Sequence, residues 1–284
     1  MLGSWCLRPT SSCASDTTCR IYGGLPQKKQ TFRHWPLRRG VTDKVMLLSP
    51  DGYLDEYRSL GIASVPGLLD STQLSAAREW LARLIALGDQ LPASYEPEFE
   101  PGALDAPRVR KLRRLYWNDP AFWSPLLVIS RIAEVARKLV GADVALVFHA
   151  AFLKPARAGS PVALHQDQAL WRYVYPNAVS IWVALARAGA DNGALLGCPR
   201  SHEAGLLPHK PISGHPWHGG VDWAAEGLAA PVRYDVSPGD ALAWHRYFVH
   251  GSGPNVGEDD RWATVFVFVD RTQPGVVATD RSDF

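Results

Sequence analysis

The sequence contains little cysteine, with four residues in 284, and only Cys198 lies beyond residue 20. One cysteine in the body of the chain has no partner there, which excludes a disulfide-stabilised secreted fold and favours a reducing compartment, the cytoplasm. Cys6, Cys13 and Cys19 lack a CxxC pair and a fourth ligand, so they predict no zinc site. Long apolar runs are also absent, and even 178–186 is far too short to cross a bilayer, so no membrane association is expected.

A large excess of charge of one sign is missing too. The formal net charge is +2, but residues 1–45 hold eight of the 30 basic residues and two of the 28 acidic ones. Residues 46–284 therefore carry 22 basic against 26 acidic side chains. A mildly acidic body does not favour nucleic acid as a partner. The 46% hydrophobic and 20% charged residues are typical of a globular protein.

Residues 1–45 are rich in Ser, Thr, Arg and Pro and have no hydrophobic periodicity. A transit peptide can have this composition, but Pro9, Pro26 and Pro36 argue against an amphipathic helix, and a secretory signal would need an apolar stretch. We expect either a disordered leader or upstream sequence translated from a mis-assigned start at which Met46 is the true first residue. Residues 46–284 are then expected to form one domain.

Helical patterns occupy the first part of this domain. Apolar residues recur at helical spacing over 51–61 and again over 70–87, where an Asp-Ser pair offers the N-cap. Residues 89–108 are rich in proline and acids and predict a loop. A further helix is expected to begin at Ser124, with a proline in its first turn, and to end before Gly141.

From about residue 143 the pattern changes to short β-branched and aromatic runs separated by turn signals. These predicted strands are 144–153, 178–186, 232–236, 241–245 and 262–270. Helices followed by strands with no helix between them predict a mainly β, α+β fold: a jelly-roll or cupin-like barrel (a double-stranded β-helix) buttressed by N-terminal helices. Residues 207–228 read as a long loop, either a substrate-facing lid or an ordinary solvated loop.

His165-Gln166-Asp167 is the only HxD tripeptide among nine histidines. At the end of a strand, residues i and i+2 point the same way, so this imidazole and this carboxylate converge. Adding one distant histidine gives the 2-His-1-carboxylate triad, which leaves open positions on iron. The tripeptide alone is weak evidence, because a surface histidine beside a surface aspartate is more common.

A second region strengthens the case. In 237–264 a Pro-Gly-Asp turn precedes a strand, His250-Gly-Ser-Gly-Pro-Asn follows, and Arg261 lies eleven residues after His250. The central segments in the same order are Trp182-Val183-Ala184-Leu185, Asp191-Asn192-Gly193-Ala194-Leu195 and Pro199-Arg200-Ser201-His202. Their order and spacing resemble the phytanoyl-CoA dioxygenase family over roughly residues 48–270. Arg200 stands where that family usually has glycine, so either the turn differs or Arg200 faces the active-site entrance.

The resemblance implies an oxidoreductase, an Fe(II)- and 2-oxoglutarate-dependent dioxygenase that uses O2 to hydroxylate an unactivated C–H bond with release of succinate and CO2. The metal ligands it implies are His165, Asp167 and His250. It also implies that the Arg261 guanidinium, which offers two parallel donors, clamps the distal carboxylate of 2-oxoglutarate. The further cosubstrate contacts that it implies are Ser252, Gln166, Trp182 and Lys111. Arg110, Arg113 and Arg114 are nearby alternatives to Lys111, and a place in the strand core is the alternative for Trp182.

Several alternatives remain open at this stage. The favoured substrate is a small organic metabolite, with secondary metabolism as the setting; the runner-up is an acyl-CoA ester of phytanoyl type. A non-catalytic jelly-roll binding protein and a cupin-type zinc or manganese enzyme are the rivals from other classes. Asp167 favours hydroxylation over halogenation, although desaturation and cyclisation use the same ligands. A monomer and a homodimer are both compatible with the sequence.

Histidines 209, 215 and 218 fit no standard zinc pattern, and His202 is expected to make a structural hydrogen bond.

Overall fold

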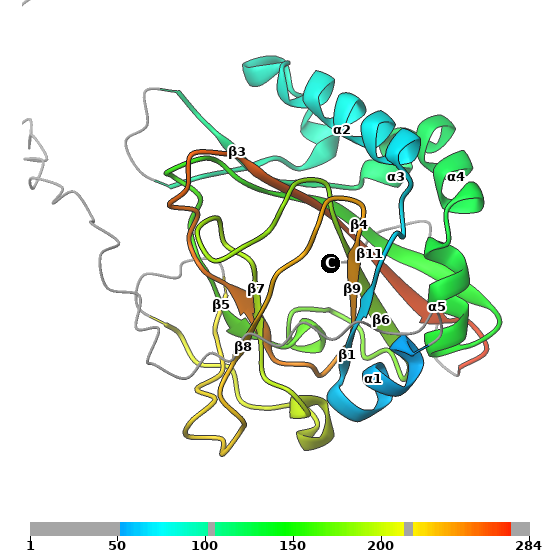
Figure 1. Cartoon of the computed structure of the whole chain (residues 1–284), viewed down its shortest axis with the longest axis vertical. Coiled ribbons are helices and arrows are strands. Elements are labelled where there is room, and N and C mark those ends of the chain that lie inside the picture. Colours follow the sequence, from blue (N-terminus) through cyan, green and yellow to red (C-terminus); the bar gives the residue numbers. More distant parts are fainter. Residues whose placement is uncertain (1–51, 102–105, 213–217, 274–284) are drawn as a thin grey trace, which may run out of the picture. The chain divides into compact units, whose positions relative to one another are not determined.

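The computed structural model describes residues 52–101, 106–212 and 218–273. The predicted leader and its boundary near residue 46 lie outside these residues. The described part consists of two antiparallel sheets and a set of helices packed on one of them (Figure 1). None of the helices in these ranges has the length and apolar character needed to cross a membrane.

The larger sheet has seven strands, and its long central strands come from the β-branched runs of the sequence. In spatial order they are β1 (Ile62–Val65), β9 (Ala241–His245), β6 (Ala178–Ala184), β11 (Arg261–Asp270), β4 (Val144–Lys154), β3 (Val109–Arg113) and β2 (Glu98–Phe99). The pairing of β11 with both β4 and β6 places the C-terminal strand at the centre.

The smaller sheet has four strands in the order β5 (Val162–His165), β10 (His250–Ser252), β7 (Leu195–Gly197) and β8 (Val232–Tyr234). The inner residues of both sheets share one apolar core, in which Val265 and Trp182 of the larger sheet join Leu195 of the smaller one. Two antiparallel sheets facing each other across such a core confirm the predicted jelly roll.

The helices are α1 (Tyr53–Leu60), α2 (Ser71–Ile85), α3 (Leu115–Asn118), α4 (Pro120–Ile129) and α5 (Ile132–Val140). A second core forms where their apolar faces meet the outer face of the larger sheet, with Trp80 and Leu81 of α2 and Phe266 of β11 among its buried residues. Asp70 caps α2 through a reciprocal capping box with Gln73. The predicted buttress of N-terminal helices is therefore confirmed.

The helix expected to begin at Ser124 is wrong in its start and its continuity. Asp119 is the N-cap instead, with its side chain accepting from the Phe122 N–H, and the chain leaves the helical conformation at Ser130 before α5 begins. In the turn after Cys198, Arg200 adopts the left-handed region (φ 65°) that favours glycine. Cys198 is buried and unbonded, as expected.

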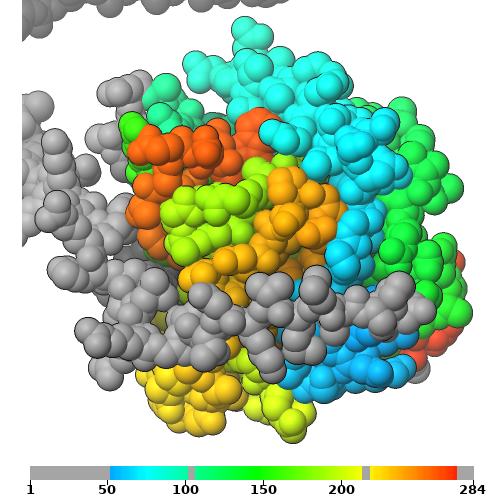
Figure 2. All heavy atoms as spheres, in the orientation of Figure 1, coloured from blue at the N-terminus to red at the C-terminus, as the bar shows by residue number. Residues whose placement is uncertain are grey.

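Three loops lie next to one another on the face shown in Figure 2, and they are residues 186–193, 237–240 and 254–260. Val256 N–H donates to the Asp191 carbonyl and Ala188 pairs with Val236, so the contacts between them run through the backbone. These bonds tie the segment before β11 to the segment before β7. The segments that lead into β7 of the smaller sheet and β11 of the larger sheet are thereby held next to one another.

His149 lies in the outer core on β4, where its buried ring stacks on Phe266 with 4.1 Å between ring centroids. Its Nε2–H donates to the Thr264 hydroxyl (2.9 Å), which in turn donates to the Ala150 carbonyl. Burial lowers the pKa of His149 well below its usual value. The folded protein therefore holds this histidine neutral.

Replacing His149 with phenylalanine is expected to reduce the acid sensitivity of the fold. Below about pH 6.5 the unfolded chain takes up a proton on this histidine and the folded chain does not, so the free energy of unfolding falls as the pH falls. This loss is at most about 1.4 kcal/mol per pH unit, and the variant lacks it. Urea denaturation of both proteins at about pH 8, 6 and 5 measures the difference, with the value at pH 8 giving the combined effect of changed packing and of the lost hydrogen bond to Thr264. Parallel pH curves would contradict this expectation.

Candidate metal centre and cosubstrate pocket

His165, Asp167 and His250 come together between the two sheets. His165 ends β5 and lies opposite His250, which begins β10, while Asp167 opens the 3-10 turn that follows β5. Asp167 Oδ1 is 3.7 Å from His165 Nε2 and 3.6 Å from His250 Nε2. These gaps are too wide for hydrogen bonds and match three ligand atoms placed around one ion at about 2.1 Å each. Among the described residues, this is the one group of three His, Cys, Asp or Glu side chains whose ligand atoms lie close enough together to hold a metal ion.

Backbone carbonyls orient both imidazoles. His165 Nδ1 lies 2.8 Å from the Ala163 carbonyl, and His250 Nδ1 lies 3.0 Å from the Phe248 carbonyl. A carbonyl only accepts, so each Nδ1 carries the proton and each Nε2 presents its lone pair to the centre. Burial lowers the pKa of both histidines, which favours the neutral form that binds metal.

Asp167 is held through one oxygen, which leaves the other for a metal. Ser180 on β6 donates its hydroxyl to Oδ2 (2.5 Å), and Trp244 on β9 donates its indole N–H to the same oxygen (2.9 Å). Burial alone would raise the pKa of this carboxyl, but His250, His165 and the Ser180 hydroxyl outweigh it and hold the pKa below its usual value. The donor set therefore fits a divalent iron ion with open positions.

Removing the Ser180 hydroxyl is expected to weaken metal binding without removing a ligand. In Ser180→Ala the carboxylate loses one of its two orienting bonds, and such changes beside a metal ligand typically cost about 10–100-fold in affinity. Anaerobic titration with Fe(II) checks the dissociation constant. Ser130→Ala is the matched control, because Ser130 lies at the break between α4 and α5 and only accepts from the Ile132 N–H. Equal affinities for the two variants would contradict the proposed orientation of Asp167.

A cavity of about 350 Å³ adjoins the three residues and reaches between the sheets. Arg261, at the start of β11, is 3% exposed and lines the cavity together with Ser252 of β10. The guanidinium lies 5.6 Å from the Trp182 ring, and its Nε has no hydrogen-bond partner among the described residues. A buried, incompletely bonded guanidinium in a cavity fits a carboxylate ligand.

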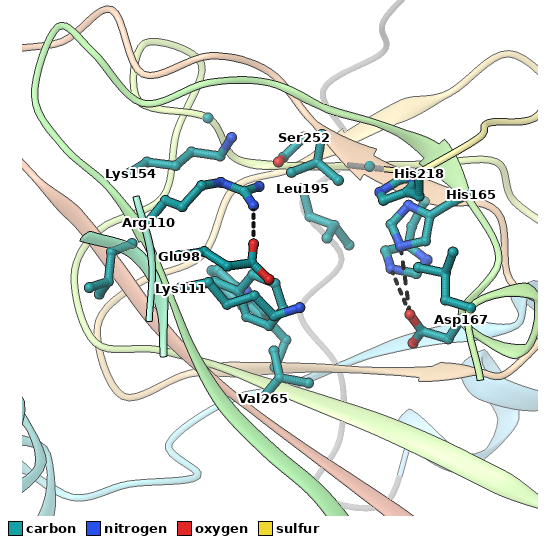
Figure 3. A pocket seen from close by; sticks show the side chains of 18 of the residues that line it. Glu98, Arg110, Lys111, Lys154, His165, Asp167, Leu195, His218, Ser252 and Val265 are labelled. Atoms are coloured by element: carbon teal, nitrogen blue, oxygen red, sulfur yellow. Dashed lines mark hydrogen bonds and ion pairs between the residues drawn. The ribbon is translucent and has the colours of Figure 1, made fainter. Parts of the chain in front are cut away.

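Lys111 reaches the same cavity from β3. Its ammonium lies over the rings of Phe148 (5.6 Å) and Phe152 (4.9 Å) on β4. Burial lowers the pKa of Lys111 to about 8. Figure 3 shows Lys111 across the cavity from Asp167 and His165. Of the predicted cosubstrate contacts, the structure thus brings Arg261, Ser252, Trp182 and Lys111 to one cavity.

Gln166 is not brought to this cavity. Its buried side chain donates to the Gly205 and Tyr247 carbonyls (2.7 Å each) and accepts from the Leu207 N–H (2.8 Å). Because side chains alternate along an extended chain, the residue between His165 and Asp167 faces the other way. Gln166 therefore does not make the predicted contact with cosubstrate. Its hydrogen bonds instead hold the loop that begins near residue 205.

The loop 207–228 contributes His218 to the cavity wall. The His218 ring lies 4.3 Å from the His165 ring, and its Nδ1 lies 2.7 Å from the Gly219 carbonyl. Burial lowers the pKa of His218 to about 4. This placement favours the substrate-facing alternative for the loop. His209 instead accepts from the Gln166 N–H (2.9 Å), and residue 215 lies outside the described residues.

Other predicted residues lie away from the cavity or at its edge. The His202 ring lies 3.3 Å from the Arg58 carbonyl, which confirms the structural hydrogen bond expected of it. Arg200 forms an exposed ion pair with Glu203 (3.0 Å), so it does not face the cavity. Trp171 borders the cavity. Arg110 and Arg113, the nearby alternatives to Lys111, also line the cavity. Sequence reasoning missed three further charged residues of the wall, which are Glu98, Glu100 and Lys154.

Comparisons with known proteins agree with this geometry. Residues 57–263 match the family model described as phytanoyl-CoA dioxygenase (PhyH). The chain is 26% identical to methylphosphonate hydroxylase of Gimesia maris over 74% of this chain and 77% of that protein. The peroxisomal phytanoyl-CoA dioxygenase of Bos taurus is 30% identical over 41% of this chain and 37% of its own length, so the match spans well under half of that relative.

Solved structures share the fold. EvdO2 from Micromonospora carbonacea var. aurantiaca, solved with 2-oxoglutarate, superposes with a TM-score of 0.59 at 22% identity over 84% of this chain and 97% of its own. The family match covers most of the domain and includes all three candidate ligands. The chain therefore belongs to the phytanoyl-CoA dioxygenase family and is an Fe(II)- and 2-oxoglutarate-dependent dioxygenase that uses O2.

Proposed function

We propose that His165, Asp167 and His250 bind the iron and that Arg261 and Ser252 bind the distal carboxylate of 2-oxoglutarate. The observation that carries the proposal is the convergence of three ligand atoms, within 4.8 Å of one another, beside a cavity that is also lined by a buried arginine. A dicarboxylate that chelates a metal through one end needs a cation at the other, and Arg261 fits that need.

Bound iron and 2-oxoglutarate supply the oxidation of a C–H bond by O2, with release of succinate and CO2. The residues of the chain position the reactants. The Ala163 and Phe248 carbonyls fix the imidazole tautomers, and Ser180 fixes the carboxylate. The aromatic walls, which include Trp182 and Phe152, exclude water from the cavity.

We propose hydroxylation of a small organic metabolite as the reaction. The cavity volume of about 350 Å³ lies at the low end of ligand sites, and cosubstrate and substrate must share it. A compact substrate meets that limit, whereas an acyl-CoA ester, the alternative, would place most of its atoms outside. The location in the cytoplasm and the monomeric or dimeric state stay predictions.

Incubation with a pool of small metabolites, iron, 2-oxoglutarate and ¹⁸O₂ tests the reaction. The expected result is one product that carries a single ¹⁸O atom, formed in step with succinate and absent from His165→Ala. A parallel incubation with acyl-CoA esters distinguishes the alternative. Labelled succinate that forms at the same rate with and without every compound tested would contradict the small-metabolite proposal.

A further inference from the structure

Two cations face each other inside the larger sheet. Lys154 ends β4 and Arg261 begins β11, and the register of these antiparallel strands places the two residues directly opposite each other. Each is 3% exposed, and both line the cavity. Like charges opposite each other destabilise a sheet, and a buried cation costs free energy unless an anion neutralises it. The Lys154–Arg261 pair therefore needs negative charge nearby to offset this cost.

The described carboxylates supply only part of that charge. Glu100, which follows β2, is 7% exposed and favours the charged forms of both Arg261 and Lys154. Arg110 on β3 also faces Lys154, but it forms its own ion pair with Glu98 (2.5 Å). One carboxylate, Glu100, is thus left to balance two cations.

The surroundings of Lys154 show that its side chain is accommodated with little room to spare. A Cβ at Gly193 would lie 2.6 Å from Lys154 Cδ, and a Cβ at Gly159 would lie 2.6 Å from Lys154 Cβ. Two glycines therefore leave space for the chain to pass. Its ammonium donates to the Ser160 carbonyl. In Figure 3 the amine end of Lys154 points toward Ser252, which lines the same cavity as Arg261.

The pKa of Lys154 reflects the electrostatic cost of this arrangement. Burial first, and then Arg261, hold the pKa of Lys154 well below its usual value. Glu100 opposes the shift without cancelling it. A second carboxylate at this end of the cavity would pair with the excess positive charge and favour the ammonium form.

We propose that Lys154 is a cosubstrate-binding residue that holds the distal carboxylate of 2-oxoglutarate together with Arg261. This inference rests on the proposed function of Arg261 and extends it. With the carboxylate bound, Glu100 and the ligand together balance the two cations. The pair then selects 2-oxo acids that end in a carboxylate over those that end in a methyl group.

Binding of two 2-oxo acids to the iron-loaded, full-length protein without oxygen tests the proposal. The ligands are 2-oxoglutarate and 2-oxopentanoate, which has a methyl group in place of the distal carboxylate. In Lys154→Met we expect the affinity for 2-oxoglutarate to fall about 10–100-fold, as for loss of one charged hydrogen bond. The affinity for 2-oxopentanoate should change little. Calorimetry and the metal-to-ligand charge-transfer absorption both report binding without turnover.

Controls separate contact from structure. Lys154→Gln keeps a donor for Ser160 without the charge. Lys138→Met removes an ammonium on α5 that pairs with Glu134 and does not line the cavity. Lys154→Gln should repeat the selective loss and Lys138→Met should bind as the wild type does. An unchanged affinity for 2-oxoglutarate in a folded Lys154 variant, or an equal loss for both ligands, would overturn the proposal. If the wild type bound neither acid, the proposed function would fail and not this inference alone.

Discussion

Replacing His250 with alanine is expected to abolish iron-dependent turnover. The variant loses one of three ligands, and the free energy of a typical protein metal site corresponds to about 3 kcal/mol per ligand, or roughly a hundredfold or more in affinity. The loss also leaves the buried Asp167 carboxylate beside a single imidazole. Fe(II) titration and succinate formation measure the two effects separately.

His202→Ala is the matched control for this change. His202 lies in the 3-10 turn Ser201–Ala204, where its ring is hydrogen-bonded to the Arg58 carbonyl, and it does not line the cavity. The control should bind iron as tightly as the wild type. Retention of tight iron binding in His250→Ala, with loss in His202→Ala, would remove His250 from the proposed ligand set.

Replacing Arg261 with methionine is expected to raise the 2-oxoglutarate concentration required for half-maximal succinate formation by about a hundredfold. A bidentate charged contact contributes about 1.5–3 kcal/mol per hydrogen bond, and methionine fills most of the space without a charge. Arg261→Lys should fall between the two, because an ammonium cannot donate two parallel bonds in the same fork. The expected order of affinity is wild type, lysine, methionine.

The rate at saturating 2-oxoglutarate should change less than the half-saturating concentration, because Arg261 is proposed to bind the cosubstrate and is not one of the candidate metal ligands. Arg187→Met is the control: Arg187 is exposed and pairs with Asp191 (2.8 Å) four residues away. Thermal denaturation shows whether the loss of a buried cation beside Glu100 has unfolded the protein. A folded Arg261→Met protein with an unchanged 2-oxoglutarate requirement would exclude the proposed clamp.

The candidate ligands could be predicted from the sequence because each sits in a local pattern. The HxD tripeptide supplies two convergent side chains by strand geometry, and the spacing from His250 to Arg261 matches the short strand β10 and the loop that follows it. The family resemblance misplaced Gln166, since its neighbours in sequence face the cavity and it faces away. A family resemblance assigns a role to a position in the sequence, but it does not determine which side of the strand the side chain faces.

Residues brought together by long-range pairing could not be predicted. Lys154 and Arg261 are opposite each other only because β4 pairs with β11 in one register, and nothing within either segment specifies that register. The short strands β1 and β3 were missed because four or five residues between helical patterns carry too little periodicity. The break between α4 and α5 at Ser130 was missed because apolar residues continue across it.

The central claim is that the His165, Asp167 and His250 centre oxidises 2-oxoglutarate with O2, and succinate formation tests it most directly. Protein loaded anaerobically with Fe(II) is mixed with 2-oxoglutarate and oxygen, and succinate is measured for the wild type and His165→Ala. The account predicts iron-dependent succinate from the wild type and none from the variant. Wild-type protein that forms no succinate and also fails to bind 2-oxoglutarate, or a His165→Ala protein as active as the wild type, would contradict it.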